Sequence, residues 1–255
     1  MISKSFIKVL ISVTAVCLSL SGCAMSAANP ALISENLGTA TNASPQQATR
    51  TPVVEVKPGE DLQSAINKMD RGGKLVLKSG TYEIKGTIVI ENKDNMVLEG
   101  EGEVWLNTKG IDHQVITIKD SKRISLINIK AQHVIIDEDD NRRIDDGRDG
   151  SVVGVYSSEK LTFENCELVG CGIYGLYAEN TGEVIINGCY IHHNSLGALY
   201  FLNRAGVTNV YLKGNRISNN ADYLKKDGNI NLFADDSNTI KDNSPDAYRE
   251  GREKR

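Results

Sequence analysis

Four short segments of the sequence end in an aromatic side chain. Of the patterns in the sequence, this recurrence is the one best suited to form a binding surface. The segments are 153–156, 174–177, 197–200 and 230–233. Because neighbouring residues on a β-strand point to opposite faces, the residue before each ring would point inward and the ring itself outward. The inward residues would be Val155, Leu176, Leu199 and Leu232. The outward stripe would be Tyr156, Tyr177, Tyr200 and Phe233.

Such a stripe would offer apolar ring surfaces on which sugars can pack, and tyrosine hydroxyls that can form hydrogen bonds. We therefore expect these four rings to form the binding surface for a polysaccharide. The alternative is a structural ladder that shields the sheet, or that the protein's own insertions or tail cover. The sequence leaves both interpretations open.

An acidic insertion, DEDDNRRIDDGRDG at residues 137–150, precedes the segment that bears Tyr156. Its alternating carboxylates are typical of calcium loops, but Arg142 stands where an EF-hand needs glycine. The insertion is therefore either an irregular Ca²⁺ site or a solvated loop with internal Asp–Arg pairs. The candidate Ca²⁺ ligands are Asp137, Asp139, Asp140 and Asp145.

The aromatic segments recur at a nearly constant interval. Gly154 and Gly175 are 21 residues apart, from 175 − 154, and Ala198 follows after a further 23, from 198 − 175. A second apolar strand follows each of the first three segments. Short strands with this period predict a β-solenoid, in which each coil buries its apolar face against its neighbours. We expect about six or seven coils.

The start of the repeat region carries a resemblance to a known group. The sequence runs DLQSAINKM, GGKLVLKSGTYEI and IVIENKDNMVLEGEG, and later VIINGCYIHHNSLGALYF and VYLKGNRISNN. It resembles right-handed parallel β-helix repeat proteins of the pectin-lyase-like group over roughly residues 53–243. The resemblance implies an all-β, right-handed parallel β-helix. We also predict a short N-terminal capping helix, because four apolar residues recur there at helical spacing: Leu62, Ala65, Ile66 and Met69.

The same resemblance implies an activity. Lyases of this group use Ca²⁺ to neutralise a uronate and an Arg or Lys as the base. A Ca²⁺-assisted polysaccharide lyase is therefore a second hypothesis, with Arg148, Arg204 and Lys225 as candidate bases. The Trp-x-Asp-His and Arg-x-Pro-x-x-Arg patterns of pectate lyases are absent from the sequence. We rank binding above catalysis and keep a non-catalytic envelope scaffold or assembly subunit as a third hypothesis.

Two further repeat positions predict stacked side chains. HHN at 192–194 aligns with SNN at 218–220, so Asn194 and Asn220 are expected to form part of an asparagine ladder. Such amides bond the backbone of adjacent coils and satisfy polar atoms inside a turn. Cys166 and Cys189 also share a repeat position, and we expect them to be buried free thiols.

Residues 1–22 are typical of a secretory signal, with an apolar run too short to span a bilayer. The run closes in LSGC, which resembles the lipobox of bacterial lipoproteins and implies acylation of Cys23. This predicts a lipid-anchored protein of the cell envelope, in the outer membrane if the host is Gram-negative. We interpret residues 23–52 as a flexible tether and residues 244–255 as a charged tail.

The charge balance argues against one class of partner. The net charge is −4, and removal of the two lysines in the signal gives 27 − 33 = −6. A nucleic-acid partner would need a basic stripe, which this composition does not provide. The expected partners are therefore the membrane, a polysaccharide and an envelope protein.

Overall fold

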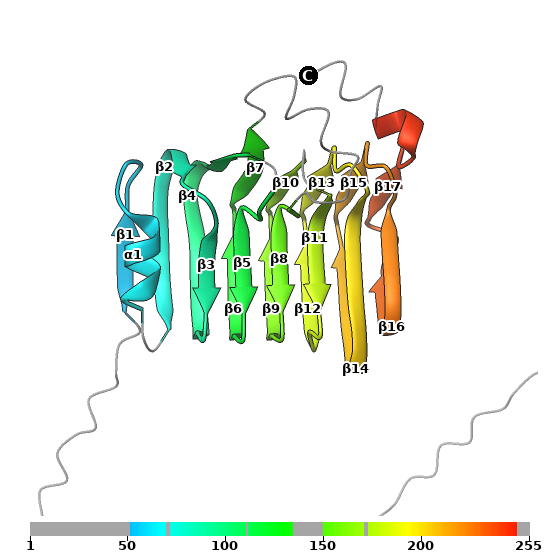
Figure 1. Cartoon of the computed structure of the whole chain (residues 1–255), viewed down its shortest axis with the longest axis horizontal. Coiled ribbons are helices and arrows are strands. Elements are labelled where there is room, and N and C mark those ends of the chain that lie inside the picture. The colour runs from blue at the N-terminus through cyan, green and yellow to red at the C-terminus, as the bar shows by residue number, and fades with distance from the viewer. Residues whose placement is uncertain (1–51, 70–71, 111, 135–149, 171–172, 249–255) are drawn as a thin grey trace, which may run out of the picture. The chain divides into compact units, whose positions relative to one another are not determined.

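In the computed structural model of the chain, parallel strands stack in successive coils (Figure 1). The structure describes residues 52–69, 72–110, 112–134, 150–170 and 173–248. The predicted signal, the predicted acylation site Cys23, nearly all of the predicted tether and most of the acidic insertion lie outside these residues. The expectations made for them stay predictions.

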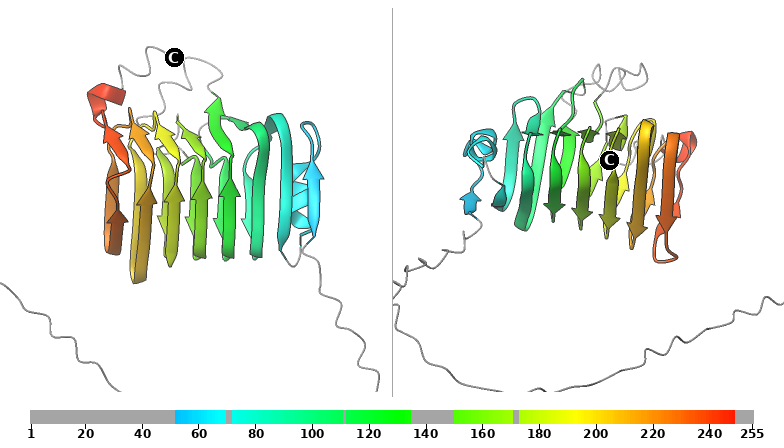
Figure 2. Two further views of the ribbon diagram at one scale, coloured as in Figure 1. Left: turned by 180° about the vertical axis from the view of Figure 1, so that it is seen from behind. Right: turned by 90° about the horizontal axis from the view of Figure 1, so that it is seen from below.

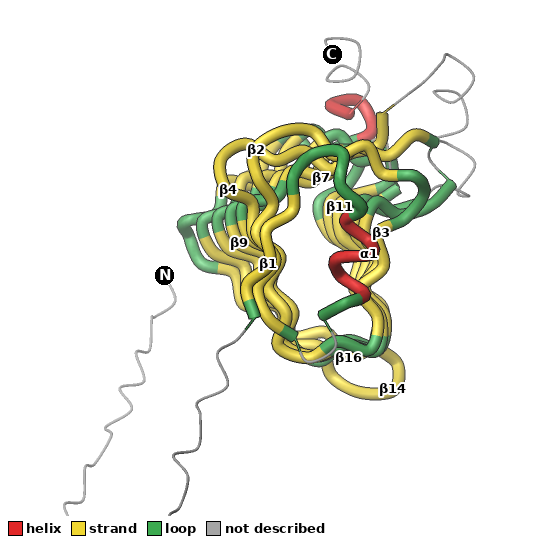
Figure 3. The backbone as a smooth tube through the Cα atoms, turned by 90° about the vertical axis from the view of Figure 1, so that its left-hand side faces the viewer, coloured by secondary structure: helices red, strands yellow, loops and turns green. Residues whose placement is uncertain are grey.

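Each full coil contributes strands to three faces, which the end-on view separates (Figure 3). The first face holds β3 (Ile88–Glu91), β5 (Ile116–Lys119), β8 (Val153–Tyr156), β11 (Tyr174–Glu179), and the first parts of β14 (Gly197–Lys213) and β16 (Leu224–Ala234). The second holds β1 (Val53–Val56), β6 (Lys122–Ile127), β9 (Glu159–Glu164), β12 (Glu183–Asn187), the first parts of β2 (Gly73–Ile84) and β4 (Asp94–Lys109), and the rest of β14 and β16. The third holds the rest of β2 and β4, then β7 (Lys130–Val134), β10 (Glu167–Val169), β13 (Tyr190–His192), β15 (Arg216–Ser218) and β17 (Thr239–Lys241).

Every recorded strand pairing is parallel, and the stack makes about seven turns. The two further views show the strands of each face side by side along the whole stack (Figure 2). The predicted all-β parallel solenoid is therefore confirmed.

One inward side chain per coil forms a continuous apolar column on the second face. Its members are paired through the backbone and at most 2% exposed: Leu75, Leu98, Leu126, Phe163, Ile186 and Leu212. Burial of each such side chain contributes about 1.5–3 kcal/mol. The period-2 alternation of each strand thus builds the core, and the opposite residues face outward.

A short helix, α1 (Leu62–Asn67), covers the N-terminal end of this core. Asp61 caps it, because its carboxylate accepts a hydrogen bond of 2.9 Å from the backbone N–H of Ser64. Leu62 and Ile66 are buried. The predicted capping helix is confirmed. None of the described helices is long and apolar enough to span a membrane.

Side-chain ladders hold the turns together. Asn194 Nδ2 donates to Asn220 Oδ1 at 2.8 Å, and Asn220 Nδ2 donates to Asn243 Oδ1 at 2.8 Å. This confirms the asparagine ladder. Cys166 and Cys189 are buried free thiols in adjacent coils, as expected, and the Cys166 backbone N–H donates to Cys189 Sγ at 3.4 Å.

Candidate functional site

Strands β11 and β14 place Tyr177 and Tyr200 side by side on the outer side of the first face. The two residues are backbone partners, and their ring centroids lie 5.3 Å apart at 74°. Both rings are half-buried. This part of the predicted stripe is in the expected register.

The ring of Tyr156 also lies beside that of Tyr177, although its backbone register differs from the predicted one. Its backbone pairs with Glu179 and not with Tyr177, so the predicted register for this coil is wrong by two residues. Gly154 is the partner of Tyr177, and a Cβ on Gly154 would lie 3.1 Å from Tyr156 Cε2. The ring of Tyr156 therefore folds back over Gly154, and its centroid comes within 5.7 Å of that of Tyr177.

Phe233 does not belong to this stripe, and the prediction that placed it there is wrong. It pairs with Tyr211 on the second face, and their rings stack at 4.9 Å and 14°. Lys225 holds the position beside Tyr200 instead. The error arose because β14 and β16 each run through two faces, and both faces carry an apolar residue followed by an outward residue.

Two further residues extend the run of rings. The Tyr174 ring, which is buried, lies 5.1 Å from that of Tyr200. On the other side, Lys225 Nζ lies 4.7 Å from the Tyr200 centroid, a cation–π distance. We call the set Tyr156, Tyr174, Tyr177 and Tyr200 the tyrosine face.

Polar partners fix the tyrosine hydroxyls. Gln114 Nε2 donates to the Tyr156 hydroxyl at 2.9 Å, and the Tyr177 hydroxyl donates to Glu179 Oε2 at 2.7 Å. Burial, and next the hydrogen bond to Glu179, raise the pKa of Tyr177. Burial likewise raises the pKa of Tyr156. Both hydroxyls therefore stay neutral at ordinary pH and can form hydrogen bonds with a ligand.

The other predicted site residues divide into two groups. Arg148 and the candidate Ca²⁺ ligands Asp137, Asp139, Asp140 and Asp145 lie outside the described residues. Arg204 is largely exposed and forms an ion pair with Asp227 at 2.5 Å, which raises the pKa of the guanidinium. Of the candidate bases, the structure therefore brings Lys225 onto the tyrosine face.

The histidines form contacts of their own. His192 Nδ1 lies 2.6 Å from His193 Nδ1, although adjacent residues on a regular strand point to opposite faces. The reason is the left-handed backbone of His193, with φ of 57°, which ends the alternation. Among the described residues, no three His, Cys, Asp or Glu side chains are placed to hold one metal ion.

Sequence reasoning missed Tyr174, Glu179 and Gln114 as members of the site. Tyr174 and Glu179 lie in the same strand as Tyr177, so the strand itself held a signal. Gln114 precedes β5 and has no Tyr, Phe or Trp beside it in the sequence, so nothing there marked it.

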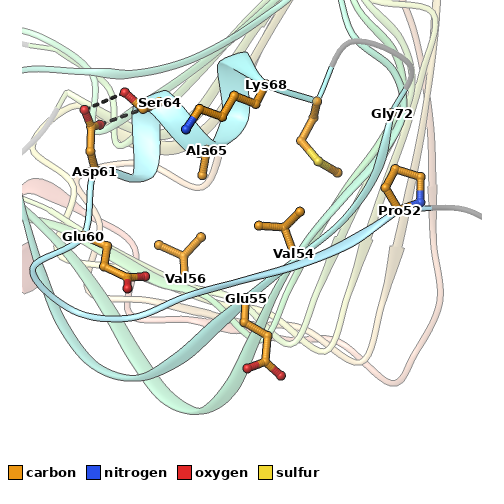
Figure 4. A pocket seen from close by; sticks show the side chains of 11 residues that line it. Pro52, Val54, Glu55, Val56, Glu60, Asp61, Ser64, Ala65, Lys68 and Gly72 are labelled. Atoms are coloured by element: carbon orange, nitrogen blue, oxygen red, sulfur yellow. Dashed lines mark hydrogen bonds between the residues drawn. The ribbon is translucent and has the colours of Figure 1, made fainter.

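A second concave feature lies at the N-terminal end, between β1 and α1. It is a groove of about 590 Å³ lined by the apolar side chains of Val54, Val56, Ala65 and Met69. Figure 4 shows Val54 and Val56 on the β1 side and Ala65 on the α1 side. Asp61 on its rim already hydrogen-bonds to Ser64. The other charged residues that line it include Glu55, which forms an ion pair with Lys78 at 2.9 Å, and Glu60, which accepts a hydrogen bond from the Lys57 backbone N–H at 2.7 Å.

Comparison with known proteins agrees with the fold. Residues 150–247 match the family described as "Right handed beta helix region". The chain is a right-handed parallel β-helix protein. No curated protein matches its sequence.

Two solved structures are similar to this β-helix protein. ORF18 of Geobacillus virus E2 is 17% identical, with a TM-score of 0.52 over 74% of this chain and 40% of that one. Jun a 1, the major allergen from cedar pollen, is 10% identical, with a TM-score of 0.51 over 72% of this chain and 66% of the allergen. The β-helix protein thus spans less than two thirds of either relative, and the likeness is one of fold.

Proposed function

We propose that this β-helix protein is a lipid-anchored protein of the bacterial envelope that binds a polysaccharide along its tyrosine face. One observation carries the proposal. The rings of Tyr156, Tyr177 and Tyr200 lie in contact across three successive coils. Stacked strands are about 4.8 Å apart, so a polymer that lay along the solenoid axis would meet one ring per coil.

The surroundings of the rings favour a polar, extended ligand. Gln114 and Glu179 hold the hydroxyls at the surface, where a sugar can hydrogen-bond to them. Lys225 adds a cation at one end of the run. Among the described residues it forms no ion pair, so it can attract a carboxylate or sulfate of an anionic polymer.

A binding assay tests this proposal. The purified full chain would be passed over a panel of immobilised neutral and anionic polysaccharides, and its dissociation constant measured for those that retain it. We expect Tyr177→Ala to weaken binding by about tenfold, which corresponds to about 1.4 kcal/mol. Tyr211→Ala is the matched control, because it removes an exposed tyrosine from the second face. Equal effects of the two variants, or no retention on any polymer, would contradict the proposal.

The lipid anchor needs its own test. An apolar run followed by LSGC supports acylation of Cys23. Cells that express the protein would be fed a labelled fatty acid, and label should appear in the wild-type chain and be lost in Cys23→Ser. Each acyl chain on Cys23 strengthens membrane attachment, because each buried CH₂ contributes about 0.8 kcal/mol. Label retained in Cys23→Ser would reject the anchor at this residue.

A polysaccharide lyase is the second candidate, and the position of Lys225 on the tyrosine face is the observation that favours it. As the base, Lys225 would act through its unprotonated amine, which would accept the proton beside the uronate carboxylate while the glycosidic oxygen leaves and the double bond forms. The carboxylates of the acidic insertion would hold the Ca²⁺. The same polymers would be incubated with the chain, with and without Ca²⁺, while the absorbance of unsaturated products is followed. Calcium-dependent product that disappears in Lys225→Ala would establish the lyase. If the chain is neither retained on a polymer nor forms product, the result would favour the scaffold hypothesis.

A further inference from the structure

Two imidazole rings converge at the end of β13. The Nδ1 atoms of His192 and His193 lie 2.6 Å apart, and the ring centroids lie 4.8 Å apart at 78°. His192 is the last residue of β13, and the left-handed backbone of His193 brings the second ring back toward the first. Histidine is the commonest metal ligand in proteins, through either ring nitrogen, so this pair is a candidate metal site.

The fold of this turn does not require the histidine pair. Val169 holds the position of His192 one coil earlier, and Ser218 holds it one coil later. Asn219 follows Ser218 with the same left-handed backbone as His193, at φ of 58° against 57°. The two turns stay in register, because the His193 backbone N–H donates to the Asn219 carbonyl at 3.1 Å. The next coil therefore forms the same turn with a serine and an asparagine.

Glu167 fixes the proton and the orientation of the first ring. One of its carboxylate oxygens lies 3.1 Å from His192 Nε2, and the other lies 3.2 Å from Lys130 Nζ. A carboxylate only accepts hydrogen bonds, so Nε2 of the neutral imidazole carries the proton and Nδ1 carries the lone pair. The Tyr190 ring stacks on the same imidazole at 3.8 Å and 21°. A carboxylate on the far nitrogen is the arrangement that orients metal-binding histidines.

The separation of the two Nδ1 atoms indicates which metal geometry fits. A single hydrogen fits between them when the His193 Nδ1–H donates to His192 Nδ1, and its transfer to Nε2 of His193 leaves two lone pairs that converge. Metal–imidazole bonds of about 2.0–2.1 Å set two nitrogens about 2.9 Å apart at a right angle and about 3.3 Å apart at a tetrahedral angle. The observed 2.6 Å is nearer to the right angle, which is typical of tetragonal Cu²⁺.

We propose that His192 and His193 bind a Cu²⁺ ion through their Nδ1 atoms, in adjacent positions of a tetragonal coordination sphere. Glu167 is the positioning residue of this site, because it holds His192 in the tautomer that a metal needs. The His193 side chain is partly exposed, so an ion can approach from solvent and water can fill further positions. Among divalent first-row metals, Cu²⁺ binds nitrogen ligands most tightly. The site lies on the third face and is independent of the tyrosine face.

Titration of the purified, untagged full chain with copper(II) chloride tests the site, followed by calorimetry and by electron paramagnetic resonance. We expect a Cu²⁺ ion whose spectrum shows coupling to two nitrogens. His192→Ser and His193→Asn introduce the residues of the next coil, so the turn should still form. Each should remove one nitrogen from the spectrum and lower the affinity by about tenfold or more, and Glu167→Gln should lower it by about tenfold.

His113→Gln is the control, because it removes another partly exposed imidazole, whose side chain is 26% exposed, and should leave the affinity for Cu²⁺ unchanged. A chain that binds no Cu²⁺ would overturn the proposal. So would equal affinities of the wild-type chain and His193→Asn, or a loss of binding in His113→Gln, because the ion would then lie elsewhere. An unchanged affinity in Glu167→Gln would reject its positioning role. Circular dichroism of each variant would verify that the β-helix is folded.

Discussion

The ring of Tyr156 lies 5.7 Å from the ring of Tyr177, although the two backbones are not partners. The contact exists because Gly154, the true partner of Tyr177, has no side chain and leaves room for the ring. A single glycine thus connects β8 to the tyrosine face. Substitution of Gly154 would therefore disturb the tyrosine face without removing an aromatic residue.

We predict that Gly154→Val displaces the Tyr156 ring and lowers polysaccharide affinity as much as Tyr156→Ala does. The valine Cβ would lie 3.0 Å from Gln114 Cγ and 3.1 Å from Tyr156 Cε2, so both side chains of the site must move. Both are only partly buried and valine suits a strand, so the free energy of unfolding should change by about 1 kcal/mol. Binding and thermal denaturation would be measured together. Thr162→Val is the control, since it places a valine at an outward strand position on the second face. Unchanged affinity in Gly154→Val would show that the position of Tyr156 does not matter for binding.

Removal of one rung of the asparagine ladder should destabilise the fold. Asn220 is 0% exposed, and its amide donates to the Ile191 carbonyl at 3.0 Å while its oxygen accepts from Asn194. Asn220→Ala would leave buried backbone groups without partners, which costs about 1–3 kcal/mol for each group left unpaired. Urea denaturation would measure the loss. Asn231→Ala removes an exposed amide and should be nearly neutral, so similar losses in the two variants would count against the ladder.

The sequence predicted which residues point inward more accurately than it predicted which residues are neighbours. Val155, Leu176 and Leu199 are all buried as expected, because the alternation of a strand has a period of two. A shift of two residues preserves that alternation, so the faces alone cannot fix the register of Tyr156 against the next coil. The fold followed from the repeat, whereas the tyrosine face depended on register.

Insertions limited the prediction in a second way. Between Asn203 and Thr208, β14 carries extra residues at the corner where β16 has a single one. The two coils therefore have different lengths, and an alignment by aromatic residues moved Phe233 to the wrong face. Only the spatial pairing shows that Lys225 belongs beside Tyr200.

The cysteine pair occupies the same ladder positions that asparagines hold in later coils. Cys189 N donates to Asn215 Oδ1 at 2.8 Å, and Asn215 Nδ2 donates to the Ile186 carbonyl at 2.8 Å. Cys189 Sγ lies 3.5 Å from the equivalent Phe163 carbonyl. We predict that Cys189→Asn extends the ladder by one rung and keeps or raises stability, by about 1 kcal/mol. Cys189→Leu, which lacks a donor, should lose stability in the same urea titration; the opposite ranking would refute this equivalence.

His133 should make the fold sensitive to acid. It is 2% exposed, and its Nε2–H donates to the His113 carbonyl at 2.7 Å, while among the described residues Nδ1 is buried without a partner. Burial lowers its pKa from 6.5 to about 4, so the native imidazole is neutral. The unfolded chain instead takes up a proton below pH 6.5. The free energy of unfolding should therefore be highest above pH 6.5 and fall as the pH drops toward 4, by about 3 kcal/mol in total.

The measurement is urea denaturation of the full chain at a series of pH values between 4 and 7.5. His133→Gln can still donate to the His113 carbonyl but cannot take up a proton, so its stability should fall less steeply over this interval. His113→Gln is the control, because it removes the ring of the neighbouring histidine, whose side chain is 26% exposed, and leaves the accepting carbonyl in place. If His133→Gln and the wild-type chain lose stability in parallel, the acid sensitivity belongs to other groups and His133 is not its source.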